Sequence, residues 1–404
     1  MSAVNIVTLH SGSISATLTH PGAELPVPDF SIAAPPLELA RQALQSSLEF
    51  PPLKDCIFPG DRVAIVPDLE TAELPDLLAA IVEVLNRVPD EGVSPVIILP
   101  PDPDANAWDS LRRCWPDAVK ALPVALHDPN ERTQVSYIAS TAAGERIYIN
   151  REAAEADVLI TVGGMRFDSV YGVRGGTSAV FPALADTETI RQTGFEGGDR
   201  YRPEHRETRQ QLIQEISGFL GTQYALQLIP GPRGPSRILA GTPAAVHAAG
   251  LQLLEEIWAV RPKRRAELVV ISVNTSQPFA WSLLAETLEK AAAWVEDGGR
   301  LAAVVDVPVP SGPAAELVRR SNDPIEAARV LRRQPLPDGI EMLRLLEVSQ
   351  RARVFVLSRL PEDLTEELGL FPLTDESELQ RLSSQVSRCV VLPNAAALRP
   401  PRRG

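Results

Sequence analysis

Apolar and polar positions follow one another along this chain in a pattern that predicts alternating strands and helices. Short apolar runs such as 62–67 and 157–162 are bounded by polar or turn residues, which is typical of buried strands. Between such runs, residues 73–88 place apolar side chains three and four positions apart, as an amphipathic helix does. The succession predicts an α/β protein whose sheets are mostly parallel and flanked by helices.

The same reading gives two groups of elements separated by a charged linker at 261–265. In the first group we expect helices over 37–47, 73–88, 106–120, 202–221 and 242–259, strands over 62–67, 94–100, 122–126, 157–162, 223–230 and 237–240, and a hairpin over 135–149 turned by Gly144. In the second group we expect strands over 267–273, 301–307, 353–358 and 388–392, a turn at 298–299, and helices over 279–295, 313–333, 339–350, 362–368 and 376–386.

Length supports two domains, because 404 residues exceed what one hydrophobic core usually serves. Residues 1–34 are rich in Ser, Thr and Pro, and we expect a loosely ordered or edge-strand arm there. We then expect one α/β domain over 35–260, a second over 266–396, and a basic tail over 397–404. A ligand cleft is predicted between the two domains.

Charge and cysteine content narrow the function. The formal charge, 39 minus 52, is −13, which argues against nucleic acid or an anionic membrane as a partner. The three cysteines are scattered and have neither metal-site nor disulfide spacing, so a reducing cytoplasm is expected. No apolar run is long enough to span a bilayer, and the first 20 residues do not resemble a secretory signal.

The most informative stretch is a glycine-rich loop that follows the strand at 157–162. Glycine tolerates positive φ and close approach, so backbone N–H groups of such a loop can converge on an anion. Side chains within the loop add donors suited to a carboxylate or phosphate. The alternative is a tightly packed turn without a ligand. The predicted ligand-binding positions of the loop are Gly172, Arg174, Gly175, Gly176, Thr177 and Ser178.

Further candidates lie near predicted strand ends, where open α/β sheets place functional groups. His127 and Asp128 follow one strand and either bind a ligand or brace the next loop. Asp68 follows another and is positioned to orient a ligand. Arg166 and Arg174 either hold an anion or pair with Asp168 and Glu196 at the surface. The arginines between 200 and 209 are expected on a solvated helix face.

Several of these segments together resemble the nickel-dependent lactate racemase family. The run from Gly172 to Pro182, GVRGGTSAVFP, is similar to the glycine-rich signature of that family, roughly G-[YF]-S-G-G-x-K-x-[IV]-x-P. The likeness spans most of residues 35–395. The other matching positions are His127-Asp128, Gly144, 149–151, Ala156-Asp157, Ala240-Gly241 and His247.

The resemblance implies a two-domain lactate-racemase-like fold and an isomerase ancestry acting on 2-hydroxy acids. In the family, two histidines alternate as base and acid, and a nickel-pincer nucleotide is tethered to a lysine. Here the lysine position reads Ser178, the first catalytic histidine Asp168, and the nickel-binding histidine falls near Gly194. The family pattern D-x-x-R becomes Asp68 followed by Thr71.

We therefore expect a divergent family member without the nickel-pincer machinery, with no cofactor and no metal, that binds a small anionic molecule. One alternative is an active racemase or epimerase of a 2-hydroxy acid, with Asp168 and Asp68 as its catalytic residues. The other is a non-catalytic structural partner. The sequence identifies neither a protein partner nor the ligand.

Overall fold

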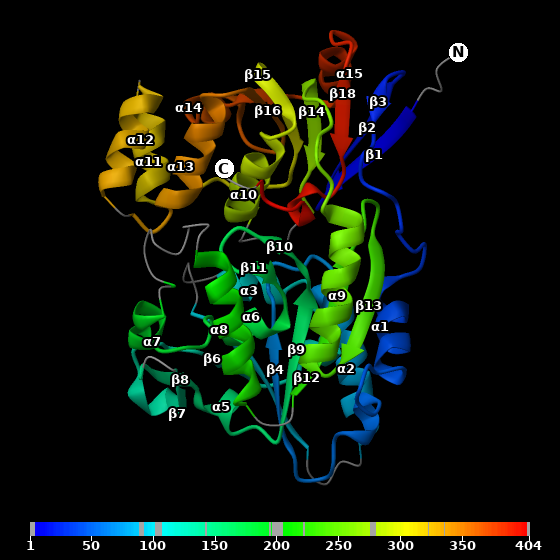
Figure 1. The fold of residues 1–404 in the computed structure, drawn as a ribbon, viewed down its shortest axis with the longest axis vertical. Helices are drawn as coiled ribbons and strands as arrows, with labels where there is room; N and C mark the ends of the chain where they lie inside the picture. Colours follow the sequence, from blue (N-terminus) through cyan, green and yellow to red (C-terminus); the bar gives the residue numbers. More distant parts are fainter. Residues whose placement is uncertain are drawn as a thin grey trace. The chain divides into compact units, whose positions relative to one another are not determined.

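The two groups of elements form two six-stranded sheets, each flanked by helices (Figure 1). The computed structural model describes residues 5–88, 93–101, 107–141, 144–193, 195, 205–220, 223–274, 280–321, 323–334 and 336–401. Contacts divide the chain into a first unit, residues 31–230 and 234–256, and a second unit, residues 1–30, 231–233 and 257–404. The cleft expected between the domains stays a prediction.

The sheet of the first unit has the order β13-β12-β9-β4-β5-β6. All neighbouring pairs are parallel except β12 and β13, which form an antiparallel hairpin. Two further hairpins, β7 with β8 and β10 with β11, lie outside this sheet. The strands of the unit are β4 (Arg62–Pro67), β5 (Ser94–Leu99), β6 (Val124–Leu126), β7 (Val135–Ser140), β8 (Arg146–Asn150), β9 (Val158–Gly164), β10 (Arg166–Asp168), β11 (Gly172–Arg174), β12 (Gln223–Pro230) and β13 (Pro235–Gly241).

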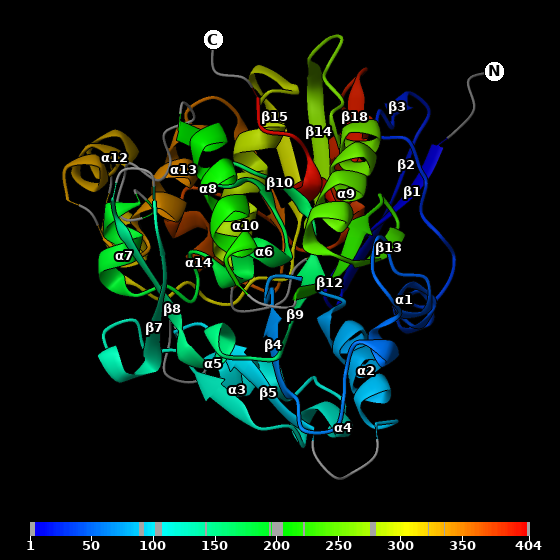
Figure 2. The ribbon, with the colours of Figure 1, turned by 60° about the horizontal axis from the view of Figure 1, so that its bottom comes forward.

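Helices cover this sheet and bury its apolar side chains. Figures 1 and 2 show α1 and α2 side by side, with α1 next to β13. Ile65, Val66 and Leu159 of the central strands β4 and β9 are almost fully buried. The helices are α1 (Pro36–Gln45), α2 (Leu74–Leu85), α3 (Ala107–Arg112), α4 (Asp117–Lys120), α5 (Arg151–Ala154), α6 (Gly176–Val180), α7 (Thr187–Gln192), α8 (Arg206–Gly218) and α9 (Pro243–Trp258).

The second unit contains a wholly parallel sheet in the order β17-β16-β15-β14-β18-β3. Its strands are β3 (Ala23–Glu24), β14 (Ala266–Ser272), β15 (Val295–Val304), β16 (Arg353–Leu357), β17 (Phe371–Leu373) and β18 (Cys389–Leu392). Its helices are α10 (Ala280–Ala291), α11 (Pro313–Arg320), α12 (Pro324–Arg333), α13 (Gly339–Ser349), α14 (Glu362–Glu367) and α15 (Glu376–Ser384).

The N-terminal segment is not loosely ordered, and, as the other expectation for it stated, it contributes an edge strand, β3, to the second sheet. It folds into the hairpin β1 (Asn5–Ser11) and β2 (Ile14–His20), whose alternate residues Leu9 and Leu18 are fully buried in the core of the second unit. The backbone N–H of Thr17 donates to Glu376 of α15 at 3.1 Å, which fixes the hairpin to this helix. In the sequence, the alternation of the apolar residues Val7 and Leu9 with polar residues is the pattern that indicates strand β1.

Two other elements differ from the expected ones. The helix expected over 106–120 is two short helices, because Pro116 lacks an N–H and cannot continue a helix from the preceding turn. Strand β15 begins at Val295 and runs through the predicted turn, where Gly298 has a φ of +75°. Among the residues that the structure describes, no helix is long and apolar enough to cross a membrane.

The buried hairpin leads to the first prediction. Replacing Leu9 with Ala removes a fully buried side chain from the core of the second unit and should lower the free energy of unfolding by about 2–5 kcal/mol. Ile6 of the same strand is 70% exposed, so Ile6→Ala provides the matched control and should change it by less than about 1 kcal/mol. Denaturant unfolding measures both. Equal small losses would mean that the hairpin contributes little to the core.

Candidate ligand site

The candidate site lies where the order in which strands are added to the first sheet reverses. After β4 the chain adds β5 and β6 on one side and then returns to place β9 on the other side of β4. Side chains at the carboxyl ends of the two strands flanking such a switch point commonly bind ligands in open α/β sheets. Asp68 follows β4, and the glycine-rich loop follows β9.

The glycine-rich loop forms a short hairpin and a short helix. Strands β10 and β11 pair Asp168 with Gly172, and the carboxylate of Asp168 accepts the N–H groups of Val170 at 2.7 Å and Tyr171 at 2.8 Å. Gly172 has a φ of +77°, a conformation that glycine adopts without steric cost. Asp168, which the sequence suggested as a base, therefore holds the hairpin turn.

Two arginines of α8 hold the same turn from the other side. Arg206 Nε donates to the carbonyl of Ser169 at 3.2 Å, and Arg209 Nη1 donates to that of Val170 at 3.1 Å. Arg209 is 3% exposed. The expectation of a solvated arginine face is therefore wrong for these two residues, because both guanidiniums bond to the hairpin backbone. Arg200 and Arg202 lie outside the described residues.

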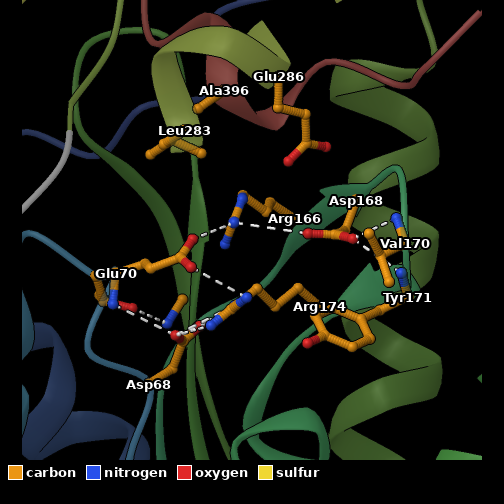
Figure 3. Close-up of polar contacts among 12 residues, drawn as sticks. Asp68, Glu70, Arg166, Asp168, Val170, Tyr171, Arg174, Leu283, Glu286 and Ala396 are labelled. Atoms are coloured by element: carbon orange, nitrogen blue, oxygen red, sulfur yellow. Dashed lines mark hydrogen bonds and ion pairs between the residues drawn. The ribbon is translucent and has the colours of Figure 1, made fainter. Parts of the chain in front are cut away.

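The charged side chains of the loop join those that follow β4 in one ion-pair cluster (Figure 3). Arg174 contacts Asp68 Oδ1 through Nη2 at 3.2 Å and Glu70 Oε1 through Nη1 at 3.1 Å. Arg166 Nη2 contacts Glu70 Oε2 at 2.5 Å and Asp168 Oδ2 at 3.7 Å. Of the pairings that the sequence offered, that of Arg166 with Asp168 is present, but neither arginine is on the open surface, and Arg174 pairs with Asp68 and Glu70. Glu196 lies outside the described residues.

Burial strengthens the attraction between the charges of this cluster, because little water screens them. The side chains of Asp68, Asp168, Glu70 and Arg166 are between 1% and 11% exposed, and that of Arg174 is 20% exposed. Desolvation by burial works against the charged guanidinium of Arg174, but the negative charges of Asp68 and Glu70 outweigh it and raise its pKa well above the ordinary value. The ring of Tyr171 adds a cation–π contact at 5.5 Å.

Glu70 is a member of this site that sequence reasoning missed. It lies two residues beyond Asp68 in the turn that follows β4, and it bridges both arginines. A carboxylate so close to a strand end at the switch point was the signal that could have identified it.

The glycines of the loop do not present all their donors to a ligand. The N–H of Gly175 donates to Ser178 Oγ at 3.1 Å, and that of Gly176 donates to Gln227 Oε1 at 2.9 Å. The hydroxyl of Ser178 in turn donates to the carbonyl of Gly175 at 2.7 Å. The N–H groups of Gly175 and Gly176 therefore do not form the predicted anion site, because these donors already have partners within the protein.

Close packing explains why a glycine stands at position 176. A Cβ there would lie 2.6 Å from Gln227 Nε2 and still closer to the hydroxyl of Thr161. No side chain fits in that space, whether or not a ligand is bound. The tight structural turn, which the sequence left as an alternative, accounts for this residue.

His127 and Asp128 lie at the end of β6 and brace the structure around them. His127 is 2% exposed; its Nε2 lies 3.0 Å from the carbonyl of Ala185 and its Nδ1 3.3 Å from the amide of Asn150. Asp128 accepts the N–H of Asn130 at 2.9 Å. Desolvation by burial lowers the pKa of His127 and keeps the imidazole neutral.

His247 belongs to a chain of polar side chains beside the loop. Its ring nitrogens lie 3.2 Å from the amide of Gln210 and 3.4 Å from that of Gln214, both on α8. The amide of Gln214 also donates to Thr177 Oγ1 at 3.4 Å. Desolvation lowers the pKa of His247 as well. Thr177, predicted to bind a ligand, is thereby held by α8.

In the second unit, α10 carries Leu283 and Glu286 on consecutive turns of the helix. Glu286 pairs with Lys290 one turn later, at 2.9 Å, and both side chains are buried. Lys290 also donates to the carbonyl of Ala396 at 2.8 Å. These charges therefore stabilise α10 against the chain that follows β18. Within the described part of the chain, no group of three or more His, Cys, Asp or Glu side chains is placed to hold a metal ion.

The fold and the site define a class: a two-unit α/β protein with a glycine-rich hairpin at the switch point of its first sheet. The sequence model of the lactate racemase N-terminal domain matches residues 27–196. Residues 27–196 accordingly form a lactate-racemase-like N-terminal domain, as the resemblance of the motifs implied.

Solved structures agree with this fold. The lactate racemase apoprotein from Thermoanaerobacterium thermosaccharolyticum matches with a TM-score of 0.69 and 15% identity, covering 98% of this chain and 100% of that one. A structural-genomics protein from Thermotoga maritima matches with a TM-score of 0.60 and 11% identity, covering 92% and 100%. At these identities the likeness shows the fold alone. No curated protein matches the chain.

Burial of His127 leads to a prediction about pH. The unfolded chain takes up a proton at this histidine near its ordinary pKa of about 6.5, whereas the folded state keeps it neutral to lower pH. Protonation then favours the unfolded state, so this histidine lowers the free energy of unfolding as pH falls below about 6.5. The stability difference between wild type and His127→Gln should therefore narrow from pH 7 to pH 5.

Denaturant unfolding at several pH values measures this difference. His10→Gln is the matched control, because the side chain of His10 is exposed. A difference between wild type and His127→Gln that stays constant over this pH range would contradict the prediction.

Proposed function

We propose that this chain is a divergent lactate-racemase-like protein that works without the nickel-pincer nucleotide and binds a small anionic molecule through Arg166 and Arg174. The observation that carries the proposal is the ion-pair cluster at the carboxyl ends of β4 and β9. It places two guanidiniums at the switch point, where open α/β sheets bind ligands.

Three positions argue against the family cofactor. Ser178, at the tether position, has a hydroxyl instead of an amine, and that hydroxyl is bonded to the backbone of Gly175. Asp168, at the position of the first histidine, holds the hairpin turn. The family nickel histidine falls near Gly194, which lies outside the described residues. The side chains present do not fit the nickel-pincer group, and we assign no catalytic step to it.

An anionic ligand is supported by the chemistry of the two arginines. A guanidinium offers five N–H donors in a planar fork that matches carboxylate and phosphate. The side chains of Arg166 and Arg174 remain 11% and 20% exposed, so each retains some access to solvent. We place the protein in the cytoplasm, because Cys56, Cys114 and Cys389 are all free thiols.

The active racemase or epimerase remains the second candidate. Asp168 retains a carboxylate at the position of a family base, and Asp68 lies within the same cluster. Asp168 accepts hydrogen bonds from two backbone N–H groups. These bonds favour a structural role in the turn over a role in proton transfer. A purely structural partner is the third candidate, and the absence of anion binding would favour it.

The first test concerns the cofactor. Co-expression with the enzymes that make the pincer nucleotide should give protein of unmodified intact mass and no stoichiometric nickel, because Ser178 provides no amine for the tether. A lactate racemase that carries the family lysine, expressed in the same cells, serves as the positive control. A nucleotide adduct on this chain would refute the proposal.

The second test concerns the anion. Calorimetric titration with sulfate, phosphate, lactate and mononucleotides should detect a ligand, and Arg174→Ala should weaken its binding by about 1–3 kcal/mol. Arg174 is paired and mostly buried, so the variant should also be less stable, and thermal unfolding must show that it is folded at the titration temperature. Arg41→Ala is the matched control, since Arg41 is an exposed arginine paired with Glu83. Binding indifferent to Arg174→Ala would leave the loop as a structural turn.

A further inference from the structure

Glu70 holds an unusual position between the two arginines of the cluster. Its Oε1 lies 3.1 Å from Arg174 Nη1, and its Oε2 lies 2.5 Å from Arg166 Nη2. Each carboxylate oxygen therefore takes a donor from a different guanidinium, as Figure 3 shows. A carboxylate of a bound small molecule would make the same two contacts if it lay between these side chains.

The other two carboxylates of the cluster are held differently. Asp168 accepts two backbone N–H groups of its own hairpin turn, and Asp68 is almost fully buried beneath Arg174. Glu70 lies on the turn after β4, and its side chain is 10% exposed. Within the described residues, its carboxylate has no partner besides the two guanidiniums. Glu70 is therefore the carboxylate that can leave without breaking backbone hydrogen bonds.

We propose that Glu70 is an internal carboxylate that occupies an anion position between Arg166 and Arg174, so that a small monocarboxylate binds there by displacing it. This inference rests on the proposed function and adds a regulating residue to the same site. Glu70 sets the affinity for anions, because every ligand must compete with a tethered carboxylate.

Charge counting favours displacement over simultaneous binding. Among the residues that the structure describes, three carboxylates and two guanidiniums make up the cluster, with a formal charge of −1. A bound monocarboxylate beside an undisplaced Glu70 would bring this to −2 in a poorly hydrated place, which is unfavourable. Without the charge of Glu70 the cluster is neutral, and one monocarboxylate restores the native −1.

The experiment uses acetate as the probe. Glu70→Ala removes one methylene and one carboxylate, and acetate supplies a methyl group and a carboxylate of nearly the same shape. Sodium acetate should raise the Tm of Glu70→Ala by at least about 2 °C relative to sodium chloride at equal ionic strength. Acetate should also bind this variant at least about tenfold more tightly than it binds the wild type. Formate, which lacks the methyl group, should raise the Tm of Glu70→Ala by less than acetate does.

Glu83→Ala is the matched control. Both carboxylate oxygens of Glu83 likewise accept from an arginine, with Arg41 donating through Nε at 2.7 Å and through Nη2 at 2.5 Å. The side chains of this pair are 36% and 41% exposed, so water solvates Arg41 once Glu83 is removed. Acetate should therefore leave the Tm of Glu83→Ala unchanged.

Glu70→Gln extends the test to a variant that keeps the size of the side chain. It removes the negative charge without opening a cavity, and it should bind acetate at least about threefold more tightly than the wild type does. Should Glu70→Ala fail to fold, this variant decides the question. Equal acetate affinity in the wild type and in the folded Glu70 variants overturns the inference.

The outcomes separate this inference from the proposed function. Anion binding by the wild type that does not change in the Glu70 variants overturns the inference and leaves the proposed function standing. Acetate binding by Glu70→Ala, with none of the tested anions binding the wild type, would mean that no anion displaces Glu70, and it overturns the displacement together with the proposed function. No binding by any of the proteins overturns both.

Discussion

Two guanidiniums that are largely removed from water determine how the loops at the carboxyl ends of β4 and β9 are arranged. A charged group in such a place is costly unless carboxylates pair with it. Within the described part of the chain, three carboxylates pair with Arg166 and Arg174, those of Asp68, Glu70 and Asp168. These partners tie the turn after β4 to the hairpin after β9, two segments that are almost a hundred residues apart in the chain.

The glycine-rich loop keeps its form for reasons that do not require a cofactor. Gly176 lies against Thr161 and Gln227, where a side chain has no room. Asp168 and Arg209 satisfy the backbone of the hairpin turn from opposite sides. Packing and hydrogen bonding within the protein can therefore maintain this glycine-rich loop by themselves.

The replacements also change the electrostatic character of the site. Where the family pattern has an arginine three residues after Asp68, this chain has Thr71, whose hydroxyl accepts the N–H of Gly164. Where the pattern has a histidine, it has Asp168. Both replacements lower the positive charge at the switch point, and the remaining guanidiniums face carboxylates of the chain itself. An anion bound as proposed would compete with those carboxylates, and this competition is the physical basis of the role proposed for Glu70.

The sequence by itself determined the fold class and most elements. Strand β4 and strand β12 run over the same residues that the apolar runs predicted, because buried parallel strands carry uninterrupted apolar segments. Helix α2 was predicted from the spacing of its apolar residues, three and four positions apart. The family signature added the two-domain lactate-racemase-like fold. These features are local, so a window of the sequence contains the information that specifies them.

Only the tertiary structure decided which charged residues meet. Arg174 and Asp68 are 106 positions apart, and no local pattern indicates that they share an ion pair. Nothing local in the sequence indicates that Glu70 bridges two arginines of a distant loop, or that the N–H of Gly176 pairs with Gln227, 51 positions away. The hairpin β1–β2 joined the second unit because its buried face needs the strands of a distant segment. Pairing over such separations depends on chain topology, which periodicity and composition do not encode.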